Sequence, residues 1–232
     1  MSLKALIFDV DGTLAETEEL HRAAFNQAFS EAGIDWHWTQ DDYAILLKVT
    51  GGKERILAHA KTIGTHNIDP APLHLRKTAL YNAHLRAGAL PLRPGVERLI
   101  WSARVAGLKL AIATTTSREN IHTLLDVSFG HEARSWFTAI CTGEDVTLKK
   151  PDPEVYQLAL ERLGLHASAC LAFEDTRNGI LAARGAGLDV VVTPSRYSAN
   201  ENFSGALAVI PTLESHLIKS EQSLAPLASL IA

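Results

Sequence analysis

Five short apolar runs, separated by stretches of helical periodicity, limit what this chain can fold into more than any other feature of its sequence. Each run is short and has no 3.6-residue period, which is typical of a strand that is covered on both faces. The runs lie at 3–8, 108–114, 137–141, 169–173 and 188–192. Their alternation with helical segments predicts an α/β fold, a doubly wound parallel sheet of the Rossmann-like type.

A block of helical segments interrupts this alternation between residues 15 and 90. Its first helix is expected at 16–32, and three more follow with no strand candidate among them. A block inserted directly after the first strand lies over the carboxyl edge of the sheet, where such folds bind ligands. We therefore predict an α/β core formed by residues 1–14 and 91–232 and an inserted α-helical cap domain at 15–90.

A pair of aspartates directly follows the first strand. Asp9 and Asp11 are two residues apart, so their side chains project to the same side of an extended chain. Gly12 permits the tight turn that brings backbone N–H groups close to an anion. The alternative is a solvated acidic loop, whereas an EF-hand is excluded because its later ligand positions are missing. We interpret the pair as catalytic.

Further polar residues end the other expected strands. Thr114 ends the second strand, Lys150 follows the third, and Glu174 and Asp175 end the fourth. Because the carboxyl ends of parallel strands share one edge, four carboxylates, a hydroxyl and a lysine are expected in one crevice. Carboxylates so close together repel each other unless a cation lies among them. Oxygen ligands without His or Cys favour Mg²⁺ as that cation.

This set of groups is what phosphoryl transfer needs. A metal ion and a lysine neutralise the phosphate oxygens. Asp9 is the candidate nucleophile, which forms an aspartyl-phosphate. Asp11 is suited to protonate the leaving oxygen and later to take a proton from the attacking water.

Four segments, LIFDVDGT, IATTTS, KKPDPEVY and FEDTRNGI, resemble in this order the four motifs of the haloacid dehalogenase-like superfamily. The resemblance covers nearly the whole chain and implies a member with a helical (C1) cap. It implies catalytic roles for Asp9, Asp11, Thr114 and Lys150. It also implies a Mg²⁺ site formed by Asp9, the backbone carbonyl of Asp11, Glu174 and Asp175. Dehalogenating members lack the second aspartate, so its presence favours phosphate-ester chemistry.

The segments LAETEELHRAAFN, TGGKERI and FGHEAR are similar to the CbbY family of sugar-bisphosphate phosphatases, although LKVTGG and Thr176 depart from its pattern. This resemblance implies a phosphatase of a ketose bisphosphate such as xylulose 1,5-bisphosphate. The β-phosphoglucomutases share the core motifs and the cap, so a sugar phosphomutase remains an alternative. A non-catalytic metabolite-binding or interaction module is the alternative of another class, and the four acidic residues disfavour it.

Six further residues are candidates for substrate binding: Glu18, His21, Lys53, Lys77, Thr115 and Thr116. Lys53 begins a helix after two glycines, where backbone N–H groups and the helix dipole favour an anion, unless it is a solvated helix lysine. The GGK string lacks the remaining residues of a P-loop. Glu18 and His21 lie one turn apart and suit sugar hydroxyls, or else form an ordinary exposed face.

The remaining candidates have equally plain alternatives. Lys77 aligns with a cap lysine of the mutases that reaches toward the core. Thr115 and Thr116 either line the pocket or cap the following helix. The string Trp36-His37-Trp38 is more typical of side chains that cover a core than of a ligand site.

Charge and composition exclude several partner classes. The chain has a formal charge of −4 and no basic run, which argues against nucleic acid and anionic membranes. No apolar run reaches the roughly 18–20 residues that span a bilayer, and the first residues do not form a signal peptide. Cys141 and Cys170 have no CxxC or metal spacing and are expected as reduced packing residues. We expect a cytoplasmic monomer that acts on a small-molecule sugar phosphate.

Overall fold

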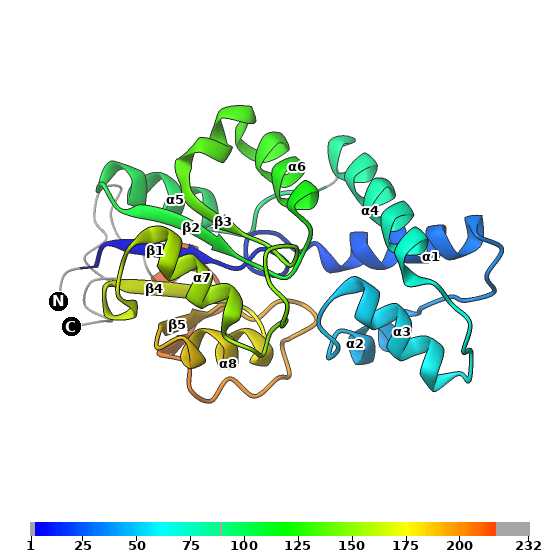
Figure 1. Ribbon diagram of the computed structural model, residues 1–232. Helices are drawn as coiled ribbons and strands as arrows, with labels where there is room; N and C mark the ends of the chain where they lie inside the picture. Colours follow the sequence, from blue (N-terminus) through cyan, green and yellow to red (C-terminus); the bar gives the residue numbers. More distant parts are fainter. Residues whose placement is uncertain (1–2, 89, 217–232) are drawn as a thin grey trace.

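The computed structural model describes residues 3–88 and 90–216 and contains one sheet of six parallel strands (Figure 1). The strand order is β3-β2-β1-β4-β5-β6. The strands are β1 (Ala5–Phe8), β2 (Lys109–Ala113), β3 (Phe137–Cys141), β4 (Cys170–Glu174), β5 (Asp189–Val192) and β6 (Ala208–Val209). The first five correspond to the five apolar runs, so the predicted α/β parallel-sheet fold is confirmed. The sequence analysis missed β6, which is two residues long.

Helices cover both faces of this sheet. Successive side chains of a strand point to opposite faces, so each strand packs against helices on both sides. Leu6 and Phe8 of β1 belong to the apolar cluster under α5 and α6, whereas Ala5 and Ile7 belong to the cluster under α7 and α8. These helices are α5 (Val96–Val105), α6 (Arg118–Phe129), α7 (Glu154–Leu163) and α8 (Arg177–Gly185). All four side chains of β1 are fully buried, which explains why its sequence is apolar without alternation.

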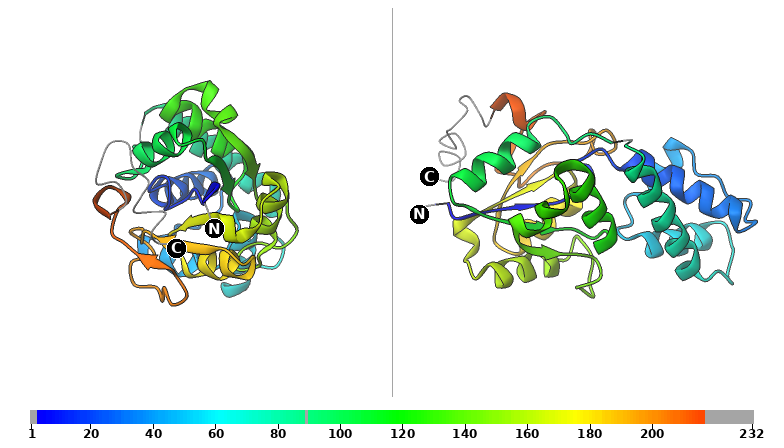
Figure 2. Two further views of the ribbon diagram at one scale, coloured as in Figure 1. Left: turned by 90° about the vertical axis from the view of Figure 1, so that its left-hand side faces the viewer. Right: turned by 90° about the horizontal axis from the view of Figure 1, so that it is seen from above.

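Four helices lie between β1 and α5 in the chain and project beyond one end of the sheet (Figures 1 and 2). They are α1 (Glu18–Glu31), α2 (Gln40–Leu46), α3 (Gly52–Thr62) and α4 (Pro70–Arg86). Two of them begin at a side-chain cap: Thr39 forms a capping box before α2, and Asp69 accepts the N–H of Ala71 at the start of α4. The extent of the cap as a separate domain stays a prediction.

The cap has an apolar cluster of its own, formed by Phe25, Phe29, Trp38, Tyr43, Ile56 and Leu73. Trp38 is fully buried in it, and Trp36 packs against it, while His37 is exposed, so the tryptophans cover a core as their pattern favours. Helices α1 and α4 also reach the larger cluster of the core, through Ala24, Ala28, Leu80, Tyr81 and Leu85. The cap is thus anchored to the core by two of its helices.

The short remaining elements are η1 (His131–Trp136), η2 (Ala167–Ala169) and α9 (Leu213–His216). The sequence of the last twenty residues, 213–232, also predicts a helical tail, and most of this segment lies outside the described residues. Both cysteines are buried and free, as expected. Within the described part of the chain, no helix combines the length and apolar character needed to cross a membrane.

Candidate active site

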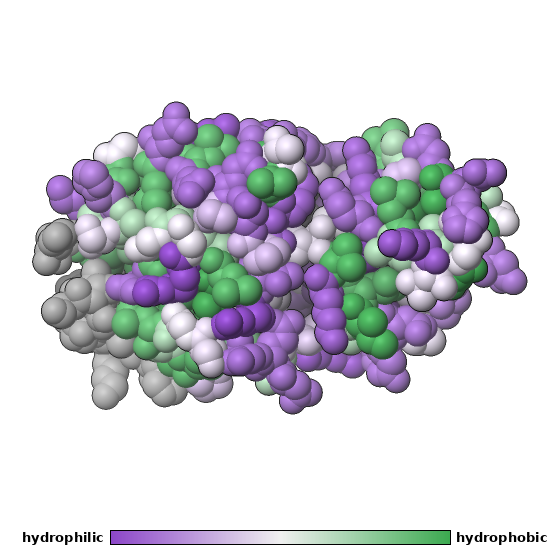
Figure 3. Space-filling model, turned by 60° about the horizontal axis from the view of Figure 1, so that its bottom comes forward, coloured by the Kyte–Doolittle hydropathy of each residue, from purple (hydrophilic) through white to green (hydrophobic). Residues whose placement is uncertain are grey.

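A pocket of about 940 Å³ lies between the carboxyl edge of the sheet and the cap. In Figure 3 the surface is hollowed between the two parts, and hydrophilic side chains border the hollow. All twelve residues predicted for the site line this pocket: Asp9, Asp11, Glu18, His21, Lys53, Lys77, Thr114, Thr115, Thr116, Lys150, Glu174 and Asp175. The parallel strands and the helical insertion therefore bring together residues that are distant in the sequence.

Asp9, Glu174 and Asp175 form the acidic floor of the pocket, and Lys150 connects Asp9 with Glu174. Its ammonium group donates hydrogen bonds to Asp9 Oδ1 at 2.7 Å, to Glu174 Oε1 at 2.6 Å and to the carbonyl of Ala113 at 2.9 Å. All three charged groups are buried, so these ion pairs are little screened by solvent. The charges of Asp9 and Glu174 raise the pKa of Lys150 although burial opposes this, and the lysine remains cationic.

Asp9, Glu174 and Asp175 form a group that fits a divalent cation. One carboxylate oxygen of each lies within 4.8 Å of the others, and all three side chains are buried. Burial raises the pKa of Asp9 to about 8, against the effect of Lys150, and burial together with Asp9 and Glu174 raises the pKa of Asp175 well above its ordinary value. A cation among them favours the charged carboxylates, and three hard oxygen donors suit Mg²⁺.

The carboxylate of Asp11 is not part of this group, because it turns toward the cap. It accepts hydrogen bonds from Thr17 Oγ1 at 2.6 Å and from His21 Nε2 at 3.1 Å. Burial favours the neutral acid, yet the interactions with His21 and Thr17 and the charge of Lys77 hold the pKa of Asp11 below its ordinary value. Of Asp11, only the backbone carbonyl is left as a candidate metal ligand.

His21 connects Asp11 to the cap lysine. Lys77 Nζ lies 2.7 Å from His21 Nδ1. When Lys77 is protonated it can only donate, so Nδ1 then accepts and Nε2 carries the hydrogen that bonds Asp11. Burial lowers the pKa of His21 and lowers that of Lys77 to about 7. Both ring nitrogens of His21 thus have partners in this structure, and its contact with sugar hydroxyls stays a prediction.

Two residues around Glu174 were missed by the sequence analysis. The hydroxyl of Tyr156 donates to Glu174 Oε1 at 2.6 Å, and a Cβ atom at Gly179 would lie 1.9 Å from Glu174 Oε2. The carboxylate is thus held on one side by the tyrosine and approached on the other by the backbone of α8. Both residues belong to segments that resemble known motifs, but only the folded chain places them against Glu174.

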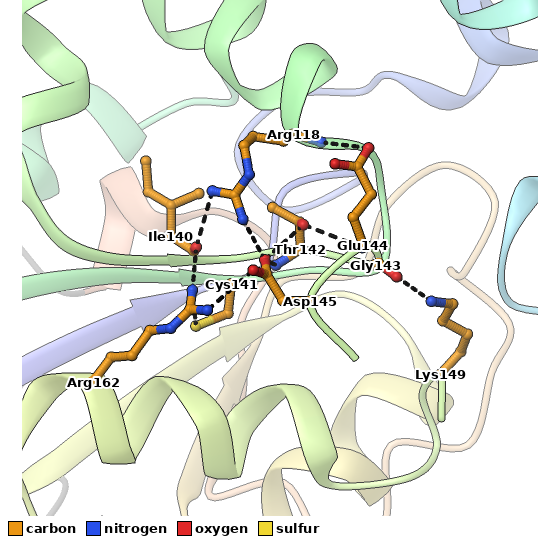
Figure 4. A network of polar contacts seen from close by, with 9 residues as sticks. All are labelled: Arg118, Ile140, Cys141, Thr142, Gly143, Glu144, Asp145, Lys149 and Arg162. Atoms are coloured by element: carbon orange, nitrogen blue, oxygen red, sulfur yellow. Dashed lines mark hydrogen bonds and ion pairs between the residues drawn. The ribbon is translucent and has the colours of Figure 1, made fainter. Parts of the chain in front are cut away.

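A polar network fixes the loop between β3 and Lys150 (Figure 4). The carboxylate of Asp145 accepts from Arg118 of α6 at 2.5 Å, from Arg162 of α7 at 3.0 Å and from Thr142 Oγ1 at 2.8 Å. Lys149 also donates back to the loop carbonyl of Gly143. The loop is therefore tied to a helix on each face of the sheet just before it delivers Lys150.

The cap wall of the pocket is rich in basic side chains. Lys53 is exposed at the start of α3, where Gly51 has a positive φ of 98°. His74 lies against Gly52, and burial with nearby Lys77 and Lys53 lowers its pKa to about 3, so its ring is neutral. These groups line the same pocket as Asp9, Glu174 and Asp175.

Glu18 of the cap is engaged by other cap residues. It accepts from the hydroxyl of Tyr43 at 2.9 Å, and Tyr43 in turn accepts from Arg55 at 2.9 Å. On the core side, Thr115 and Thr116 line the pocket, and the N–H of Gly143 donates to the carbonyl of Thr116 at 3.0 Å. The helix cap of α6 is Ser117, so capping is not the role of these two threonines.

Comparisons with known proteins agree with this geometry. The family model of the haloacid dehalogenase-like hydrolases matches residues 3–187. The chain is 51% identical to protein CbbY of Rhodobacter capsulatus over 92% of this chain and 95% of that protein. It is 50% identical to the plasmid-encoded protein CbbY of Cupriavidus necator over 91% of this chain and 86% of that protein.

Solved structures give the same relationship. A crystal structure of a CbbY variant from Rhodobacter sphaeroides in complex with xylulose-(1,5)bisphosphate has a TM-score of 0.89 at 41% identity, covering 95% of this chain and 99% of that one. A β-phosphoglucomutase structure from Thermotoga maritima, described as putative, has a TM-score of 0.66 at 26% identity, covering 91% and 95%. The expected superfamily and the expected enzyme class are thereby confirmed. The chain belongs to the haloacid dehalogenase-like hydrolases, and it is a phosphatase of that family.

Proposed function

We propose that this protein is a Mg²⁺-dependent phosphatase of a small sugar phosphate, a ketose bisphosphate such as xylulose 1,5-bisphosphate. The observation that carries the proposal is the different setting of the two aspartates. Asp9 lies beside Lys150 in a cluster suited to a cation, while Asp11 faces the cap and accepts two hydrogen bonds. This difference supports attack by Asp9 and proton transfer by Asp11.

Asp9 acts as the nucleophile in the first step. Its carboxylate oxygen forms a bond to phosphorus, the P–O bond to the sugar breaks, and the sugar oxygen takes a proton from Asp11. Lys150 neutralises charge on the phosphate oxygens, and Thr114, which is buried at the end of β2, offers a hydroxyl donor. Mg²⁺ held by Asp9, Glu174, Asp175 and the carbonyl of Asp11 would supply further positive charge at these oxygens.

Asp11 acts as the base in the second step. It takes a proton from the water that attacks the aspartyl-phosphate, which releases phosphate and restores Asp9. The contacts with His21 and Thr17 favour the charged form of Asp11 and so suit this step. Protonation of the leaving oxygen in the first step requires the neutral form of Asp11, and its Oδ2 can carry that proton while Oδ1 keeps both contacts.

The cap supports the choice of a bisphosphate. When one phosphate lies at Asp9 and Lys150, the second points toward the cap wall, where Lys53, Lys77 and the N–H groups at the start of α3 offer positive charge and donors. The Rhodobacter sphaeroides relative that binds xylulose-(1,5)bisphosphate is 41% identical to this chain. We assign the cap domain to residues 15–90, and its closure excludes bulk water from the transfer.

A sugar phosphomutase is the second candidate, because the chain also resembles a β-phosphoglucomutase structure over 91% of its length. The two reactions differ in whether water or a sugar hydroxyl accepts the phosphoryl group. The test measures phosphate release and isomer formation with xylulose 1,5-bisphosphate, ribulose 1,5-bisphosphate and β-glucose 1-phosphate, with Mg²⁺ and with EDTA. We expect phosphate release from the xylulose bisphosphate only with Mg²⁺. Conversion of glucose 1-phosphate to its 6-phosphate would favour the mutase, and no turnover of any sugar phosphate would refute both.

A further inference from the structure

A chain of three polar side chains connects the cap helix α4 with the pocket. Asn82 Nδ2 of α4 donates to Asn120 Oδ1 of α6 at 3.0 Å, and Asn120 Nδ2 donates to Thr116 Oγ1 at 2.9 Å. Asn82 is fully buried and Asn120 is 4% exposed. Their neighbours along the two helices, including Leu80, Tyr81 and Ile121, belong to the apolar cluster of the core. A buried amide pair in such an interface is costly unless its hydrogen bonds are made.

A backbone carbonyl fixes which side chain donates and which accepts in this series of hydrogen bonds. Asn82 Nδ2 also donates to the carbonyl oxygen of Thr78 at 3.0 Å, and a carbonyl oxygen can only accept. Turning the amide of Asn82 over would place its oxygen against two acceptors, the carbonyl of Thr78 and Asn120 Oδ1. The observed orientation is kept even though Asn82 Oδ1 has no hydrogen-bond partner among the described residues.

The same constraint passes along to Thr116. Because Asn120 Oδ1 faces Asn82, its nitrogen must face Thr116 Oγ1, and that oxygen must accept. The hydroxyl hydrogen of Thr116 then has no acceptor within residues 3–88 and 90–216. Thr116 lines the pocket. It therefore presents a donor there, which suits an oxygen that can only accept.

We propose that Asn82 and Asn120 are positioning residues that fix Thr116 as a hydrogen-bond donor to an anionic phosphate oxygen of the substrate. In this arrangement Asn82 of the cap helix α4 determines that Thr116 of the core donates a hydrogen bond to the substrate and does not accept one. The inference rests on the proposed function for the kind of substrate, a phosphorylated sugar. It goes further by naming the contact and the two residues that hold it.

A double-mutant cycle of Asn82→Leu and Thr116→Val tests this. Leucine is close to asparagine in size and suits the apolar interface, and valine keeps the shape of threonine without its hydroxyl. We expect Thr116→Val to lower kcat/KM roughly 10- to 100-fold and Asn82→Leu to lower it roughly 3- to 30-fold. Asn82→Leu should cause less than about a twofold further loss in the Thr116→Val background, because the donor it holds is already gone.

A matched control uses another hydrogen bond between the same two helices. Arg86 of α4 donates to Thr123 Oγ1 of α6 at 3.2 Å and has no link to Thr116. Thr123→Val should therefore leave kcat/KM within about twofold of wild type. Asn120→Asp supplies a second test, because a carboxylate only accepts and would take the hydrogen of Thr116 away from the pocket. We expect its loss to be at least as large as that of Thr116→Val.

The cycle is measured on whichever sugar phosphate the wild-type protein hydrolyses fastest. Failure of xylulose 1,5-bisphosphate as a substrate would then count against the proposed function alone. An equal loss from Asn82→Leu in both backgrounds would show a merely structural role and overturn the inference, as would no loss in the wild-type background. Unchanged kcat/KM in Asn120→Asp would overturn it independently, even if Asn82→Leu did not fold.

Discussion

We expect the hydroxyl of Tyr156 to strengthen Mg²⁺ binding at the proposed site by holding Glu174, and Tyr156→Phe tests this. The substitution removes one oxygen and leaves no cavity, because phenylalanine has the same ring. Lys150 lies 5.0 Å from the ring centroid, so its contact with the ring is kept. Among the residues that the structure describes, the direct loss is the 2.6 Å hydrogen bond to Glu174 Oε1.

The size of the effect follows from the setting of Glu174. A hydrogen bond to a charged group contributes about 1.5–3 kcal/mol, and the Glu174 carboxylate is 1% exposed, so water does not replace the lost donor. Lys150 still donates to the same oxygen, which holds the loss toward the lower end of that range. Partners that orient a metal ligand typically change metal affinity about 10- to 100-fold. We expect the Mg²⁺ concentration for half-maximal activity to rise roughly tenfold.

The assay is hydrolysis of p-nitrophenyl phosphate over a series of Mg²⁺ concentrations, with Mg²⁺ binding measured directly by calorimetry. At saturating Mg²⁺, kcat should stay within about threefold of wild type, because the Tyr156 hydroxyl contacts Glu174 and not the nucleophile Asp9. A variant with an unchanged Mg²⁺ requirement and a much lower kcat would show that Tyr156 acts on phosphoryl transfer itself. That result would refute the assignment of Tyr156 as a holder of Glu174.

Three further outcomes are expected. Asp9→Asn should abolish turnover with the fold retained by circular dichroism, because the amide keeps the shape of the nucleophile without its charge; a variant with a tenth of wild-type activity would indicate direct attack by water. EDTA should silence the wild type, and Asp175→Ala should raise the Mg²⁺ requirement steeply; activity that withstands EDTA in a phosphate-release assay would contradict the cation site. Lys53→Ala should lower kcat/KM for a ketose bisphosphate roughly 10-fold and change it far less for a monophosphate, since only the bisphosphate has a second phosphate to bind. Equal losses of kcat/KM for both substrates would assign Lys53 to cap closure or folding.

The elements that the sequence could predict are those whose pattern is local. Residues 5–8 of β1 and 190–192 of β5 are apolar at every position because both faces of these strands are covered, and that pattern can be recognised without knowing the neighbouring strands. The gathering of Asp9, Thr114 and Glu174 follows from the parallel direction of the strands alone. Charged residues at strand ends were therefore enough to locate the pocket.

What the sequence could not supply is the pairing of polar side chains within the pocket walls. Asp11 follows β1 and Glu174 ends β4, yet the carboxylate of Asp11 turns to His21 and that of Glu174 to Lys150 and Tyr156. The choice depends on which donors the cap and α7 bring within reach, which is decided by tertiary packing. The roles of Tyr156 and Asn82 were missed for this reason, since a tyrosine or an asparagine in a helix has no pattern that names its partner.

Because the cap has an apolar cluster of its own, the packing that supports its pocket wall is separate from the packing that supports the acidic floor. Phe29, Trp38 and Ile56 pack among themselves and not against the sheet, so substitutions around α2 and α3 are repacked locally. The wall that carries Lys53 is built on this cluster, whereas the acidic floor is built on the sheet. Substitutions in α2 and α3 can therefore change the size and charge of the compound that the pocket accepts. The residues proposed to break the P–O bond stay unchanged, because they are supported by the sheet.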